Sequence, residues 1–517
     1  MGILNASRPA RFRPILTIAI VTPIVILLWA WLELWTAYSI TPRIQKNYGG
    51  MIRETAEFWQ DTTGTNGWDH LAEAIRLYEA HVNSYYFEPM ERGWSGGTSE
   101  YGTIHDPEGT RKLIRDVYGT EHADAYFEAM HGWALETIGM LGSLGIQHQL
   151  DTLDECGYVL RPIEDSIITS KPQPYMSLST YRSLARCLHV RMLLSRDQGD
   201  WETYTQSFRL LSAIGHALAV QPSLLDSAVA SAILAIGRQQ IIRDLQNNAL
   251  PDQVILAIYE LTRTERQGLS LEQLLRIERY SQMDFFQRFF GKGGRLILTE
   301  YAKLVPFAEE EHWITNVQGL WKPRWGHYEK LIEDHYNEMI RIADLSFAER
   351  EPLRPENRPR SIVDRFIDPE DNEEPLPAFD PSKKFAERFL REDTAFTLAD
   401  QQILHDSLRD GLRLLLAIEA HRIATGNYPV SLEELVPASI ETLPIDPCSV
   451  AGEPWIYERF GAPDAEDRPF LLYAVGFDMQ DNGGARPTAD ITDALMRQNR
   501  GTDYVVSHPP LPESADE

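Results

Sequence analysis

Carboxylates gathered around a glycine pair near the C-terminus form the clearest chemical pattern in this sequence. Asp478, Asp481 and Asp490 flank Gly483-Gly484 in the segment FDMQDNGGARPTADI. Calcium takes several hard oxygen ligands, and aspartate carboxylates and backbone carbonyls are common among them. The spacing is not that of an EF-hand loop. We predict a calcium site formed by these three aspartates, and the alternative is an acidic turn that holds no ion.

A long helix and two short strands are predicted to hold this loop. Leucines recur at helical spacing through residues 394–425, and Gly426 follows as a stop, where a left-handed residue is least costly. Ser431 and Glu434 have the spacing of a capping box that opens a second short helix. The segments WIYERF and FLLYAVG are aromatic and β-branched, which is typical of strands. We expect the long helix to lie across a small antiparallel sheet, as an α+β domain over residues 394–508.

A series of short motifs runs through this domain in a fixed order. The motifs occupy Gly426 to Pro429, Ser431 to Leu435, Leu443 to Pro447, Gly452 to Tyr457, Leu472 to Asp478, Gly483-Gly484 and Ala489 to Ile491. Together they resemble the globular domain of the major (G-type) pseudopilin of bacterial type II secretion. The resemblance implies a bound calcium ion, with Asp478 and Asp490 at the family's aspartate positions. Asp481 is added on charge and spacing alone.

An almost unbroken apolar run near the N-terminus predicts a membrane anchor. Residues 14–36 are long enough to cross a bilayer, because about 20 apolar residues in a helix span its hydrocarbon core. The run is preceded by three arginines and no acidic residue, namely Arg8, Arg11 and Arg13. This bias predicts that residues 1–13 stay in the cytoplasm and that the bulk lies outside it, in the periplasm of a Gram-negative-type envelope. A cleaved signal peptide is the alternative.

The middle of the chain, residues 45–345, is predicted to be α-helical, so the fold class is mainly α. Apolar stripes at helical spacing are interrupted at Gly199-Asp200 and again before Pro222. Long helices joined by such short breaks stack as antiparallel hairpins. The turn GDWETYTQSFRLL weakly resembles the tetratricopeptide turn, and an ordinary helical bundle is equally compatible with the pattern.

Two segments are predicted to lack regular structure. Residues 346–393 are acidic and rich in proline, which has no backbone donor and cannot continue a helix, so we expect a linker or an extended strap. Residues 509–517 are expected to form a disordered tail.

The composition limits the function more than it defines it. A formal net charge of −27 argues against nucleic-acid binding, which needs a basic face. We predict a membrane-anchored extracytoplasmic binding or scaffold protein with protein partners. A component of a type II secretion or fibre-like apparatus is one alternative. The other is an enzyme with a site in segment 309–338, where His312, His327 and His335 lie among acidic residues, although no catalytic motif identifies a reaction.

Overall fold

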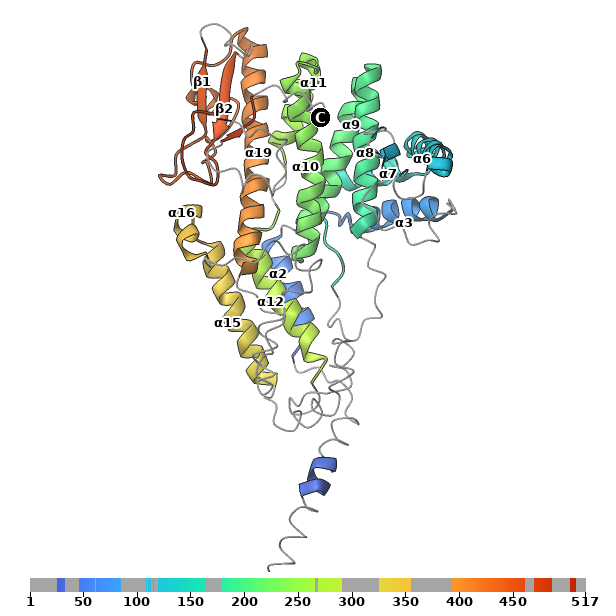
Figure 1. The fold of residues 1–517 in the computed structure, drawn as a ribbon, viewed down its shortest axis with the longest axis vertical. Helices are drawn as coiled ribbons and strands as arrows, with labels where there is room; N and C mark the ends of the chain where they lie inside the picture. Colours follow the sequence, from blue (N-terminus) through green and yellow to red (C-terminus); the bar gives the residue numbers. More distant parts are fainter. Residues whose placement is uncertain are drawn as a thin grey trace, which may run out of the picture.

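The computed structural model is mainly helical, as predicted, with one small sheet (Figure 1). The structure describes the following residues: 26–32, 46–60, 62–84, 108, 110–112, 115, 120–163, 178–265, 268–290, 325–354, 393–460, 469–485 and 503–507.

Three long helices, α8 (Leu178–Gln198), α9 (Trp201–Ala219) and α10 (Leu224–Gln246), form two hairpins at the centre of the molecule. Gly199 turns the chain with φ +71°, and the Asp200 side chain caps α9 by accepting from Thr203 N. Helices α9 and α10 lie close together, because a Cβ added at Gly215 would stand 2.5 Å from Leu234 Cγ. The interruption predicted at Gly199-Asp200 is therefore a hairpin turn.

Three further helices pack against one side of these hairpins, as Figure 1 shows. They are α3 (Trp68–Ser84), α6 (Thr120–Met140) and α7 (Ile146–Glu155). Their apolar faces join α8, α9 and α10 in one core, which includes Leu71, Trp133, Leu150, Leu188 and Leu211.

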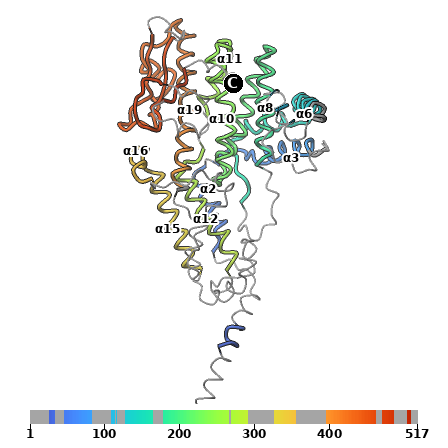
Figure 2. The backbone as a smooth tube through the Cα atoms, viewed as in Figure 1, coloured from blue at the N-terminus to red at the C-terminus, as the bar shows by residue number. Residues whose placement is uncertain are grey.

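A second group of helices lies at the end of the molecule nearest the N-terminal segment (Figure 2). It contains α2 (Tyr48–Trp59), α12 (Leu271–Gln287) and α15 (Trp325–Ala343). In Figure 2 the blue α2 runs beside the yellow-green α12, although more than 200 residues separate them in the sequence. Their core is aromatic and includes Tyr48, Phe286, Trp325, Tyr336 and Phe396. Since Phe396 belongs to the C-terminal region, this core also contacts that part of the chain.

The long helix α19 (Asp393–Thr425) carries a three-stranded antiparallel sheet of order β1-β2-β3. The strands are β1 (Ile456–Arg459), β2 (Phe470–Ala474) and β3 (Tyr504–Val505). The helix ends as predicted, because Gly426 has φ +78° and donates from its amide to Arg422 O at 2.8 Å.

The C-terminal module shares its core with the central helices. One continuous cluster joins three groups of buried side chains: Tyr204, Ile241 and Ile255 from α9, α10 and α11 (Asp252–Arg263); Leu412 and Leu416 from α19; and Trp455, Phe470 and Leu472 from the sheet region. Helix α19 thus packs on the sheet with one face and on α10 and α11 with another.

The segment after Gly426 differs from the sequence prediction. Ser431 makes no side-chain capping bond, and Glu434 accepts instead from Val430 N at 3.0 Å, so the predicted capping box is wrong. The segment is a single 3₁₀ turn, η6 (Leu432–Leu435), and its Glu434 carboxylate bonds to Val430 N rather than to the backbone of Ser431.

The segment predicted as a linker begins with regular structure. Helix α16 (Phe347–Arg350) opens with a true capping box between Ser346 and Glu349, and η4 (Glu351–Leu353) follows. The ion pair from Arg354 to the fully buried Asp400 fastens these residues to α19, and the buried Phe347 ring meets Phe477 edge-on. Residues 355–392 lie outside the part that the structure describes.

The membrane prediction falls largely on residues that the structure does not describe. Of the expected anchor 14–36, residues 26–32 are described and are helical. Within the described chain, no helix is long and apolar enough to cross a membrane. The predicted cytoplasmic tail 1–13 and C-terminal tail 509–517 also lie outside the described residues.

Candidate functional site

A cavity of about 760 Å³ opens where α2, α7, α9 and α11 approach one another, beside the start of α12. Trp59, Tyr158 and Phe208 contribute aromatic surface to its lining, and polar surface comes from Ser212, Thr264, Arg209 and others. Small-molecule sites in proteins are typically concave spaces of about 300–1,000 Å³ with a few convergent polar groups. The volume and the mixed lining make this cavity the candidate site.

A buried carboxylate stands at the edge of the cavity. Glu265 and His216 both line the space, and His216 Nε2 donates to Glu265 Oε1 at 2.7 Å. The same oxygen accepts from the guanidinium of Arg238, which lies on α10 and is only 3% exposed. Among the residues that the structure describes, Glu265 Oε2 has no hydrogen-bond partner. This oxygen is an open acceptor at the cavity.

The electrostatics keep Glu265 charged. Burial alone would raise its pKa, but the hydrogen bond from His216 and the charge of Arg238 outweigh burial and lower the pKa of Glu265 to about 2. The carboxylate is therefore ionised throughout the neutral range. Its charge is offset by Arg238, since a buried carboxylate without a partner would be protonated instead.

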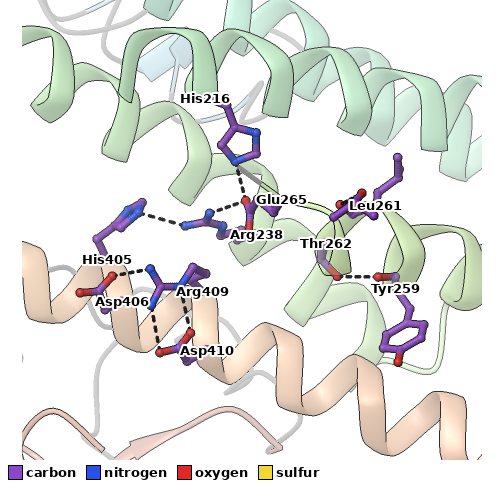
Figure 3. A network of polar contacts seen from close by, with 11 residues as sticks. His216, Arg238, Tyr259, Leu261, Thr262, Glu265, His405, Asp406, Arg409 and Asp410 are labelled. Carbon is purple, nitrogen blue, oxygen red and sulfur yellow. Dashed lines mark hydrogen bonds and ion pairs between the residues drawn. The ribbon is translucent and has the colours of Figure 1, made fainter. Parts of the chain in front are cut away.

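The polar network continues from the cavity into α19 (Figure 3). Arg238 Nη1 stands 3.4 Å from His405 Nε2. A guanidinium can only donate, so His405 Nε2 accepts and the ring proton lies on Nδ1. Further along α19, Arg409 pairs with Asp406 at 2.8 Å and with Asp410 at 2.9 Å. The network thus connects the cavity, through α10, to the helix that carries the sheet.

His405 is held neutral by its surroundings. Burial, Arg238 and Arg409 together lower its pKa from the ordinary value near 6.5 to about 3, against a smaller opposing effect of Glu265. In the unfolded chain the same imidazole takes up a proton near pH 6.5. The unfolded state therefore binds more protons than the folded state below that pH, and the stabilisation is lost as the pH falls.

We expect acidification from pH 7.5 to pH 5 to lower the free energy of unfolding by about 2 kcal/mol through His405 alone. A His405→Gln variant keeps an acceptor for Arg238 and removes this titration, so its stability should fall less steeply over the same range. Denaturant unfolding of both proteins at several pH values measures the difference. Equal slopes for the two proteins would show that His405 titrates in the folded state as it does in the unfolded chain.

The predicted calcium aspartates Asp478 and Asp481 lie in a loop, where their side chains accept hydrogen bonds from nearby backbone amides. Asp478 Oδ1 accepts from Gln480 N at 3.1 Å, and Asp481 Oδ1 accepts from Gly483 N at 2.8 Å. Asp490 lies outside the described residues. Within the described chain, no group of three histidine, cysteine, aspartate or glutamate residues is placed to hold a metal ion. The calcium site stays a prediction.

A further aspartate, which the sequence analysis missed, fixes this loop from a distance. Asp503 is 2% exposed, and its Oδ2 accepts from Asn482 N at 3.0 Å and from Gly484 N at 2.8 Å. Gly483 and Gly484 have φ +67° and +74°, a region that favours glycine. No local motif marks Asp503, because it lies 19 residues beyond the glycine pair in the sequence.

The histidines proposed for an enzyme site lie apart from the cavity. His312 is outside the described residues. His327 is exposed and His335 is half-buried, both on α15, and burial lowers the pKa of His335. Neither residue lines the cavity. The described part of segment 309–338 therefore does not contribute to this cavity.

The residues of this network could not be found from a local sequence pattern. His216, Arg238, Glu265 and His405 come from four separate segments, and none belongs to a short motif. Polar residues inside the otherwise apolar stripes of α9 and α10 were the available signal.

Comparisons with protein-family models, with curated proteins and with solved structures found no match to this chain.

Proposed function

We propose that this chain is a membrane-anchored extracytoplasmic binding and scaffold protein whose ligand site is the cavity between α7, α9 and α11. The observation that carries the proposal is the buried ionic network at its edge. Burying charged groups is costly unless they are paired, and Arg238, Glu265 and His216 satisfy one another while one carboxylate oxygen stays open. Such a prepared acceptor beside an aromatic wall is suited to holding a ligand.

The scaffold part of the proposal rests on the shared core. Stacked helical hairpins offer extended surfaces to protein partners. The C-terminal module is packed on α10 and α11 through α19, so it is presented in a fixed position. In this proposal the pseudopilin-like motifs of the module provide its calcium-stabilised contact with partner proteins of a secretion or fibre-like apparatus, and residues 14–36 provide the anchor.

A ligand screen on the detergent-solubilised full chain tests the binding function. We expect at least one compound in a mixed set of amines, carboxylates, sugars and nucleobases to raise the melting midpoint. A ligand at 100 times its Kd adds about 2.7 kcal/mol to the free energy of unfolding. A Ser212→Phe variant, which fills the cavity from α9, should lose this shift.

The matched control is Ser143→Phe, an exposed serine between α6 and α7 that does not line the cavity. It should respond like the wild type. A set in which no compound stabilises the wild type, or in which the shift persists in Ser212→Phe, would contradict a ligand site here.

A further inference from the structure

We infer that the cavity takes an organic cation, a compound with an amine or ammonium group on an aromatic or apolar body, whose charged end binds Glu265 Oε2. This inference rests on the cavity being a ligand site, as proposed above. It goes beyond that function by naming the chemical class of the ligand.

One oxygen of the Glu265 carboxylate is left to accept a hydrogen bond from a ligand. Both donors from the protein, His216 Nε2 and the Arg238 guanidinium, reach Oε1. Within the described residues nothing donates to Oε2, although the carboxylate is ionised at neutral pH. A carboxylate oxygen only accepts, so its ligand must donate. An ammonium group makes a charge-assisted bond there, and such bonds are stronger than neutral ones.

The charged groups around the cavity also favour a cation. The lining contains Asp154, Arg209 and Glu265, and their partners add Asp151 and Arg238. With histidine counted as neutral, these are three carboxylates against two guanidiniums, a net charge of −1. A cationic ligand therefore completes the balance, whereas an anionic ligand adds to the excess.

Both guanidiniums are already paired with carboxylates. Arg209 is bound by Asp151, and its Nη1 lies 3.8 Å from Asp154 Oδ2. Arg238 is 3% exposed, donates to Glu265 and does not line the cavity. An anionic ligand at Arg209 would lie close to Asp151 and Asp154, and their negative charges would repel it.

Three aromatic side chains in the lining suit the organic part of such a ligand. Trp59, Tyr158 and Phe208 contribute to the lining from α2, from the segment after α7 and from α9. Aromatic faces attract ammonium groups through the ring quadrupole, and they also bury apolar surface of a ligand. A compound that combines both features therefore fits this lining better than a small inorganic cation does.

Titration calorimetry of the detergent-solubilised full chain with three matched probes tests the inference. The probes are phenethylammonium, 3-phenylpropionate and 2-phenylethanol, which are similar in size and differ in charge. We expect phenethylammonium to bind at least tenfold more tightly than 3-phenylpropionate. In Glu265→Gln the amide oxygen can still accept from His216 and Arg238 while the negative charge is gone, so phenethylammonium should lose at least tenfold in affinity. Binding of 2-phenylethanol should be unchanged in this variant.

Glu260→Gln is the matched control, because it makes the same charge change on α11 at an exposed residue outside the cavity. Its affinities should equal those of the wild type. Any of three results overturns the inference. Phenethylammonium does not bind, it binds no better than 3-phenylpropionate, or it keeps its affinity in Glu265→Gln. The comparison of probes on the wild type decides the matter even when the glutamine variant does not fold.

The two proposals fail in different ways. When a neutral or anionic compound binds and Ser212→Phe abolishes that binding, the cation class is wrong and the cavity is still a ligand site. When no class of compound binds in the cavity, both proposals are wrong.

Discussion

Replacing Arg238 with methionine is expected to lower the free energy of unfolding by about 3–5 kcal/mol. Arg238 is 3% exposed and lies between Glu265 and His405 in the network. Without it, the Glu265 charge remains buried with His216 as its partner from the network. Removing one member of a buried ion pair is costly because the other charge is left without compensation. Denaturant unfolding followed by circular dichroism measures the change.

A surface pair and a double variant complete this experiment. Arg263 and Glu260 form an ion pair with side chains 54% and 61% exposed, so Arg263→Met should cost no more than about 1 kcal/mol. Replacing Arg238 by methionine and Glu265 by leucine together removes both charges, and it should recover most of the stability lost in the single variant. A single Arg238→Met variant as stable as Arg263→Met would show that the buried pair contributes no more than a surface pair does.

The Arg238 network also shows why the site could not be predicted from the sequence. Helical periodicity identified the apolar stripes of α8, α9 and α19, since it depends on neighbours three and four residues apart. The contact between Arg238 and Glu265 joins residues 27 apart, and the contact to His405 spans 167 residues. Such pairs depend on how whole helices pack, which a local pattern does not encode.

The same distinction applies to the fold. The turn at Gly199-Asp200 and the end of α19 at Gly426 could be predicted, because a left-handed glycine and a capping aspartate act within one turn of helix. The capping box at Ser431 was wrong although Ser346 and Glu349 form one at the same spacing, because η6 is a 3₁₀ turn in which Glu434 bonds to Val430 N. The close packing of α19 on α10 and α11 was not predicted, because the periodic pattern shows that a face is buried without naming its partner.

Trp455 is the largest side chain named above in the core that the C-terminal module shares with the central helices, and truncating it is expected to cost much stability. The indole is 2% exposed and packs at Gly411 of α19, where an added Cβ would stand 2.8 Å from Trp455 Cη2. It also meets the ring of Tyr504 edge-on, with centroids 5.9 Å apart. Truncating a buried tryptophan to alanine leaves a cavity and typically costs about 3–5 kcal/mol. We expect Trp455→Ala to lower the free energy of unfolding by that amount.

The way in which this stability is lost distinguishes a shared core from a separate domain. Leu412, Leu416 and Trp455 belong to the same buried cluster as Ile241 and Ile255 of α10 and α11. Native-state hydrogen exchange should therefore show faster opening of α10 amides in Trp455→Ala, because residues in one core unfold cooperatively. Val450→Ala, at a side chain 68% exposed, should leave the exchange unchanged. Exchange in α10 that stays at the wild-type rate while the sheet opens would mean that the C-terminal module unfolds independently of the central helices.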